Sequence, residues 1–197
     1  PSYGGNMPLY FSSLIAHLKG AGTPLVMVVA YGNREFEGAF LDMHQGVSAS
    51  GFTPVAAIAA IAQHSGAPHI ASGRPDAEDR EKLARFGLEA LRLAQSRGGS
   101  IPAPGTQRTW ELPAGMDIWP TTKPEACTGC GRCAGVCPMG AVSDDGASTD
   151  TGRCIVCAAC IKYCPAKARR FGNDETMKEY AKHLMHAVVR KEAALFV

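Results

Sequence analysis

The chain has 197 residues, of which 46% are hydrophobic and 19% are charged, and its formal net charge is +2. This length and composition suit one or two folded domains and exclude a disordered or fibrous chain. The charge is too small to indicate a nucleic-acid partner, and no uncharged apolar stretch is long enough to span a bilayer.

Residues 1–100 show alternating strand and helix signals. The apolar run Pro24–Tyr31 is typical of a buried parallel strand. Between Phe36 and Met43 the apolar residues then fall at helical spacing. The run Thr53–Gln63 is also apolar, but its alanines leave strand and helix equally open.

A helix is predicted to begin at Pro75-Asp76, because the acidic residues that follow favour the positive end of the helix dipole. Gly98-Gly99 is expected to end it. The apolar stripe of this helix is formed by Leu83, Phe86, Ala90 and Leu93. The order strand–helix–strand–helix predicts an α/β domain with an open parallel sheet.

Three further segments follow this domain. Residues 101–122 are rich in proline and contain both tryptophans, Trp110 and Trp119, which predicts a linker. Residues 123–172 hold the cysteines, and residues 173–197 are predicted to form a C-terminal amphipathic helix. The apolar face of that helix is formed by Met177, Tyr180, Leu184 and Val188.

All eight cysteines lie between Cys127 and Cys164. A disulfide framework is usually spread over a small secreted chain, so this clustering predicts metal ligation in a reducing compartment, the cytoplasm. The cysteines form two runs with the spacing C-x₂-C-x₂-C-x₃-C-P, Cys127–Pro138 and Cys154–Pro165, offset by 27 residues. Between the runs, Asp145-Gly146 is a hairpin turn signal. The repeat therefore predicts a module of two similar halves.

Two kinds of metal site use CxxC pairs. Structural zinc is held by four tetrahedral ligands, so eight cysteines would make two zinc sites. Zinc ribbons, however, separate their CxxC pairs by longer loops and need neither a third cysteine nor a repeated Cys-Pro. The spacing favours iron–sulfur clusters and leaves a zinc-bound interaction module as the remote alternative.

The cysteine spacing resembles that of the two-cluster bacterial ferredoxins, in which the fourth cysteine of each run ligates the other cluster. This resemblance implies two [4Fe–4S] clusters. The first would be bound by Cys127, Cys130, Cys133 and Cys164. The second would be bound by Cys154, Cys157, Cys160 and Cys137.

Basic residues surround the cysteines and would partly offset the negative charge of bound clusters. Ordinary surface solvation and the docking of a partner are both open interpretations of this pattern. The residues are Lys123, Arg132, Arg153, Lys162, Lys167, Arg169 and Arg170.

Three short motifs, Pro1–Pro8, Tyr31–Arg34 and Gly73–Asp76, extend the resemblance to the first hundred residues. They resemble the ferredoxins of anaerobic bacteria and archaea that carry an N-terminal flavodoxin-like domain. The resemblance implies that two loops at the carboxyl ends of strands flank the ring of an FMN cofactor. In this chain these loops consist of Tyr3, Gly4, Gly5, Asn6, Tyr31, Gly32, Asn33 and Arg34.

The chain departs from the flavodoxin pattern at its start. It has no loop rich in Ser, Thr and Gly at a helix N-terminus to cradle the flavin phosphate. It begins where the third strand of such a domain would end, so we expect residues 1–100 to form the C-terminal half of a flavodoxin-like domain. The sequence thus implies FMN for the complete protein and supplies no phosphate cradle for FMN in this chain.

The sequence predicts an electron carrier rather than an enzyme. Two [4Fe–4S] clusters would pass single electrons between partner oxidoreductases, and no nucleic-acid partner is expected. No Ser-His-Asp group or pair of carboxylates indicates a catalytic residue. The alternative is a flavin-dependent iron–sulfur reductase, which would need a complete flavin domain and a pocket for a two-electron donor.

Overall fold

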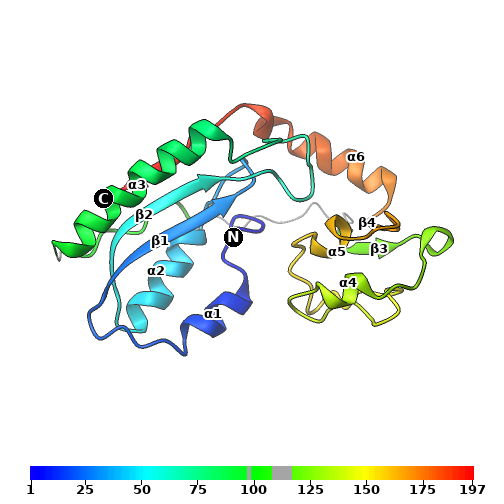
Figure 1. Ribbon diagram of the computed structural model, residues 1–197, viewed down its shortest axis with the longest axis horizontal. Coiled ribbons are helices and arrows are strands. Elements are labelled where there is room, and N and C mark those ends of the chain that lie inside the picture. The colour runs from blue at the N-terminus through cyan, green and yellow to red at the C-terminus, as the bar shows by residue number, and fades with distance from the viewer. Residues whose placement is uncertain (97–98, 108–116) are drawn as a thin grey trace. The chain divides into compact units, whose positions relative to one another are not determined.

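The computed structural model describes residues 1–96, 99–107 and 117–197 and divides the chain into two compact units (Figure 1). The first unit contains Pro1–His64, Pro68–Glu111 and His186–Val197. The second contains Ser65–Ala67 and Leu112–Met185. Gly98 at the predicted helix end and Trp110 in the predicted linker lie outside the described residues.

The first unit is built on a three-stranded sheet. Strands β1 (Pro24–Tyr31) and β2 (Thr53–Ile61) pair in parallel, which confirms the strand at 24–31 and resolves the alanine-rich run as a strand. Strand β5 (Ala194–Phe196) pairs with the other edge of β2 in the antiparallel direction. The sheet is therefore mixed, with the order β1-β2-β5, and the prediction of a purely parallel sheet is wrong at this third strand.

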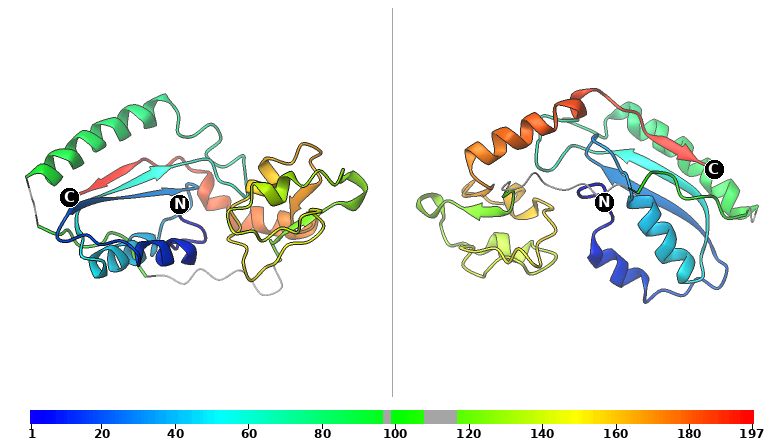
Figure 2. Two further views of the ribbon diagram at one scale, coloured as in Figure 1. Left: turned by 60° about the horizontal axis from the view of Figure 1, so that its bottom comes forward. Right: turned by 180° about the vertical axis from the view of Figure 1, so that it is seen from behind.

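Helices cover both faces of this sheet. Figure 2 shows α1 (Leu9–Ile15) and α2 (Ala39–Ala49) on one face and α3 (Ala77–Gln95) on the other. Successive side chains of a strand point to opposite faces, so β1 and β2 each serve two cores. The core on the α2 side contains Met27, Val29, Tyr31, Phe40 and Ile61, and the core on the α3 side contains Ala56, Ile58 and Ala90.

Helix α3 begins where the sequence predicts. The backbone N–H of Asp79 donates to Asp76 Oδ1 at 3.0 Å, and the N–H of Asp76 donates to Asp79 Oδ2 at 2.9 Å. This reciprocal capping box satisfies two donors that have no partner within the helix. Local hydrogen bonding therefore fixes the start of this helix.

The C-terminal region differs from the single helix predicted for residues 173–197. Helix α6 (Asp174–His183) is followed by a short 3₁₀ turn, η2 (Met185–Val188), and by strand β5. The buried side-chain amide of Asn33 donates to the carbonyls of Ala187 at 2.6 Å and Val189 at 2.8 Å, and its oxygen accepts from the N–H of Lys191 at 3.1 Å. These contacts fix residues 187–191 after α6, where the chain passes through η2 to β5 and does not continue the predicted helix.

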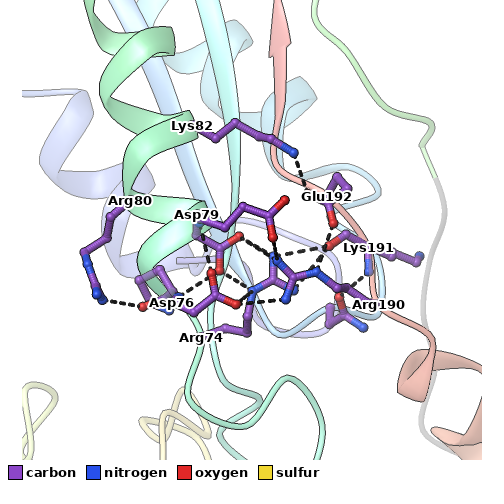
Figure 3. Close-up of polar contacts among 11 residues, drawn as sticks. Arg74, Asp76, Asp79, Arg80, Lys82, Arg190, Lys191 and Glu192 are labelled. Atoms are coloured by element: carbon purple, nitrogen blue, oxygen red, sulfur yellow. Dashed lines mark hydrogen bonds and ion pairs between the residues drawn. The ribbon is translucent and has the colours of Figure 1, made fainter.

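A group of charged residues also ties this segment to the start of α3 (Figure 3). Arg74 forms a buried bidentate pair with Asp79 and donates to the carbonyl of Lys191 at 3.3 Å. Arg190 reaches Asp76 Oδ2 at 2.8 Å. The pKa of Asp79 is lowered, chiefly by its hydrogen bonds from Arg74. These contacts attach Arg190 and Lys191 to the start of α3 within the first unit.

The second unit has little regular structure. Strand β3 (Pro120–Thr122) pairs with β4 (Arg169–Phe171), so the predicted linker ends in a strand. The hairpin predicted at Asp145-Gly146 is confirmed by an antiparallel bridge between Val142 and Thr149. The remaining elements are η1 (Pro124–Ala126), α4 (Arg132–Gly135), α5 (Ala159–Lys162) and α6. Among the described residues, no helix is both long and apolar enough to cross a bilayer.

Candidate metal centre

The two cysteine runs follow the same backbone path. Helices α4 and α5 are each four residues long and begin 27 residues apart. Three pairs of residues at this offset adopt positive φ: Gly129 (65°) and Val156 (55°), Gly131 (66°) and Ala158 (64°), and Gly140 (54°) and Lys167 (52°). The first run uses glycine at all three positions, whereas the second adopts the same conformation without glycine. Because a β-branched residue rarely has positive φ, the position of Val156 indicates that the cysteine geometry determines the backbone.

The cysteines surround two similar hollows. The first hollow is lined by Cys127, Cys130, Cys133 and Cys164. The second is lined by Cys137, Cys154, Cys157 and Cys160. Each hollow thus receives three cysteines from one run and one from the other, and these are the two ligand sets predicted from the sequence.

The first hollow is closely shaped around its sulfurs. A Cβ atom added to Gly146, at the tip of the hairpin, would lie 2.7 Å from Cys133 Sγ. Gly146 also has a φ of 73°, which disfavours any side chain. The glycine of the predicted turn therefore lets the hairpin backbone approach a cysteine ligand.

Backbone N–H groups point at several of the sulfurs. The N–H of Ala141 donates to Cys137 Sγ at 3.2 Å, and that of Val156 donates to Cys154 Sγ at 3.4 Å. Burial acts to raise the pKa of the Cys164 thiol, but N–H donors from residues 166–169 outweigh it and lower that pKa. Left-handed turns with inward N–H groups are a common way to hold anions, including iron–sulfur clusters. The loops are thus arranged to stabilise negative charge on the sulfurs.

Two other ligand positions favour the neutral thiol in the absence of metal. Burial raises the pKa of Cys133 and of Cys154. Because metals bind the thiolate, loading these positions must release protons. Iron uptake should therefore become easier as the pH rises.

The spacing of the thiols bears on the kind of metal group that fits. A zinc ion needs its thiolates about 2.3 Å away, all meeting at one point. Within the described part of the chain, no group of three or more His, Cys, Asp or Glu residues is placed to hold a single metal ion. Four cysteines line each hollow, and a [4Fe–4S] cluster has one corner for each of four thiolates.

One basic residue near the cysteines is buried. Arg169 is 3% exposed and lines the first hollow, although the sequence places it among residues expected to be solvated or to dock a partner. Its Nη1 donates to Thr122 Oγ1 at 2.7 Å, and its Nη2 donates to Thr149 Oγ1 at 2.6 Å and to Cys160 Sγ at 3.6 Å. The repeat contains a sign of this burial, because the 27-residue offset aligns Arg169 with the apolar Val142.

The two loops predicted to flank a flavin lie together in the first unit. Tyr3 and Asn6 form a tight bridge, and a Cβ on Gly5 would meet the side chains of Glu37 and Arg34. Arg34 Nη1 itself lies 2.9 Å from Glu37 Oε1. The structure therefore brings the Tyr3–Asn6 and Tyr31–Arg34 loops into contact, while flavin binding stays a prediction.

Side chains of the second loop are used within the unit. Tyr31 is buried with its ring centroid 5.5 Å from that of Phe36, and burial is the main cause that raises its pKa to about 12. Gly32 packs against His64, where a Cβ would lie 2.7 Å from the imidazole. Asn33 holds the C-terminal segment. These contacts give the loop a structural role whether or not a cofactor binds.

Comparison with known families supports the assignment of the cysteine region. Residues 120–143 match the family described as the 4Fe-4S binding domain. A search of curated proteins gave no match. The matched segment runs from β3 through the first cysteine run to the hairpin. The chain therefore contains a ferredoxin-type 4Fe-4S binding domain that follows an α/β region with a mixed sheet, and its eight cysteines are consistent with two clusters.

Proposed function

We propose that this chain is an electron carrier that binds two [4Fe–4S] clusters and passes single electrons between partner oxidoreductases. The observation that carries the proposal is the pair of hollows, each lined by three cysteines of one run and one of the other. The four cysteines around each hollow would hold one cluster, which would supply one-electron redox chemistry. The protein supplies eight thiolates and the N–H donors that stabilise their charge.

Packing within the second unit supports transfer between the two sites. Cys133 of the first hollow and Cys160 of the second are both buried and belong to one apolar cluster with Val142. Ligands of the two clusters would therefore lie in one buried apolar cluster. Such an arrangement gives an electron a short path from one cluster to the other.

Access to the surface supports exchange with partners. Cys130, a ligand of the first set, is exposed, whereas Cys133 and Cys164 of the same set are buried. The first cluster would therefore have one corner near solvent, where a redox partner can approach. This role needs no reacting side chain, because the clusters would hold the electrons.

Anaerobic purification with analysis of iron, acid-labile sulfide, zinc and acid-released flavin tests the proposal. We expect about eight iron and eight sulfide per chain, with visible absorbance that bleaches on reduction by dithionite. Cys130→Ala should lower the iron content, while the matched control Thr151→Ala, an exposed change that lines neither hollow, should retain it. Zinc in place of iron would overturn the proposal.

A turnover assay separates the carrier from the alternative of a flavin-dependent reductase. A carrier passes electrons from a reduced donor enzyme to an acceptor protein only when both are present. Reduction of the clusters by a nicotinamide nucleotide without a donor enzyme, together with bound flavin, would instead favour the reductase.

A further inference from the structure

The two halves of the repeat differ at one buried position. Val142 and Arg169 each lie five residues after the last cysteine of their run and are separated by the repeat offset of 27 residues. Val142 lines the second hollow and Arg169 lines the first, and both are buried. An apolar side chain in one half is thus replaced by a charged one in the other.

Neutral groups surround the guanidinium of Arg169. Beyond its bonds to the two threonine hydroxyls, it donates to the carbonyls of Gly146 and Pro120 at 3.4 Å. Among the described residues no carboxylate lies within 4.0 Å of it, and its buried Nε has no hydrogen-bond partner. A buried charge without a counter-charge is strongly unfavourable. The negative charge that would balance it is that of the cysteine ligands and their clusters.

The guanidinium is close to both ligand sets. Its residue lines the first hollow, and its Nη2 donates to Cys160 Sγ, a ligand of the second, at 3.6 Å. Of the residues that the structure describes, Asp145 is the one carboxylate that lines the first hollow, and it is exposed, so solvent screens it more than it screens Arg169. Within the same described ranges, no Asp, Glu, Lys or Arg lines the second hollow. Among the described residues that line the hollows, Arg169 is therefore the buried charge with the strongest electrostatic effect on a bound cluster.

We propose that Arg169 is a positioning residue that raises the reduction potentials of both clusters, and raises most the potential of the cluster bound through Cys160. The inference rests on the proposed function. Each added electron increases the negative charge of a cluster, so a buried positive charge and a hydrogen bond to a ligand sulfur favour the reduced state. Val142 provides neither effect, and the two clusters therefore differ in potential.

Redox titration followed by electron paramagnetic resonance tests the inference on the full, iron-loaded chain. Arg169→Met removes the charge and should shift the one-electron reduction equilibrium of the cluster bound through Cys160 at least tenfold towards oxidation, which corresponds to 59 mV. The other cluster should shift less. Arg170→Met is the matched control, because it makes the same charge change on the other face of β4, where Arg170 pairs with Asp174.

Four further measurements keep the inference open to refutation. Arg169→Lys should retain most of the raised potential, and the shift in Arg169→Met should persist at high salt because a buried charge is poorly screened. A chain carrying Cys130→Ala and Cys164→Ala should keep only the cluster bound through Cys160 and so assigns its potential. If Arg169→Met does not retain iron, Thr149→Val loosens the guanidinium without removing its charge and should lower the same potential.

The possible outcomes separate the two proposals. Full iron content with unchanged potentials in Arg169→Met, or an equal shift in Arg170→Met, would overturn the role of Arg169 and leave the carrier function intact. Unchanged potentials in Thr149→Val would overturn it where the methionine variant does not load. A wild-type chain without iron or sulfide would instead overturn the carrier function itself.

Discussion

The two compact units obtain their stability in different ways. The first has long elements, with strands of eight and nine residues and a helix of 19, and its cores bury large side chains such as Phe40, Met27 and Ile61. Around its cysteines the second has strands of three residues, helices of four, and an apolar cluster centred on Cys133, Val142 and Cys160. The first unit is held by its own side chains, whereas the second is organised around two hollows.

This difference shows that one chain can combine a fold determined by hydrophobic patterning with a fold determined by ligand geometry. In the first unit, apolar periodicity and capping specify the elements. In the second, residues such as Val156 adopt a conformation that their own preferences disfavour. A cluster bound by the cysteines, as we propose, would compensate for that cost.

Loss of iron should produce the largest difference between the units. We expect removal of the clusters under anaerobic chelation to unfold the region around β3 and β4, because eight thiols cannot form a packed core. Strands β1 and β2 should stay protected. Hydrogen exchange of the loaded and the iron-free chain, followed by mass spectrometry, measures both regions at once. Equal protection of β3 and β4 in the two states would contradict this prediction.

Asp79→Asn should produce the largest single-residue effect in the first unit. It removes the carboxylate that pairs with the buried guanidinium of Arg74 and leaves it only the partly exposed Asp76, 3.7 Å away. Breaking a buried pair in this way typically costs about 3–5 kcal/mol in the free energy of unfolding. The matched control is Asp174→Asn in the exposed pair with Arg170, where we expect a loss below about 1 kcal/mol. Urea unfolding of each variant gives the two values, and iron content should not change in either. Similar losses in both variants would show that the buried network is unimportant.

A pH dependence of the first unit should follow from His64. Burial is the main cause that lowers its pKa from 6.5 to about 4. Between pH 6.5 and 4 the unfolded chain therefore binds a proton that the folded chain does not, so stability is complete above pH 6.5 and falls as the pH drops. The carboxylates with lowered pKa, Asp76 and Asp79, lose their contribution only below about pH 4.

Between pH 6.5 and 4 the free energy of unfolding should fall by up to about 3 kcal/mol, and this loss concerns the first unit alone. His64→Gln should flatten the change in hydrogen-exchange protection of β1 and β2 between pH 6.5 and 4. His17→Gln, in an exposed position on the same unit, should leave it unchanged. A slope that persists in His64→Gln would assign the pH dependence to another group.

The smallest effects should come from exchanging residues between the two halves of the repeat. Val156→Gly relieves a left-handed β-branched residue and should stabilise the loaded chain by about 1 kcal/mol. Gly129→Val imposes the same strain on the first run and should destabilise it by about 1–3 kcal/mol. A Cβ on Gly129 meets nothing within 4 Å, so the change acts through φ alone. Thermal unfolding under anaerobic conditions gives both values, and effects of the same sign would contradict the pairing.

The parts predicted correctly from the sequence are those that depend on local signals. Asp76 and the stripe from Leu83 to Leu93 identify α3. The cysteine spacing predicts two groups of four cysteines, which the structure gathers around two hollows, and their binding of clusters stays a prediction. Strand β5 could not be predicted, because its three residues are a strand only by pairing with β2. The apolar period continues to Val188, so the sequence predicts a helix that runs past His183. The observed path beyond α6 is held by Asn33, which is 154 residues away from Ala187 in the sequence.

Burial of a charged residue was the main feature missed at the candidate site. Basic residues near cysteines are usually solvated, and the sequence gives no direct sign that Arg169 is enclosed by Thr122 and Thr149. The alignment of Arg169 with Val142 is visible in the repeat, but its meaning depends on knowing that this position faces a hollow. Residue type and spacing therefore predict which cysteines lie together, but not the burial of the charge beside them.

The crossed ligation of two clusters is tested most directly by two double variants. Cys130→Ala with Cys164→Ala removes two ligands of the first set, and Cys130→Ala with Cys137→Ala removes one ligand from each set. Iron per chain, measured after anaerobic purification, should fall to about half in the first variant and close to zero in the second. The reverse order would show that each run binds its own cluster and would contradict the account.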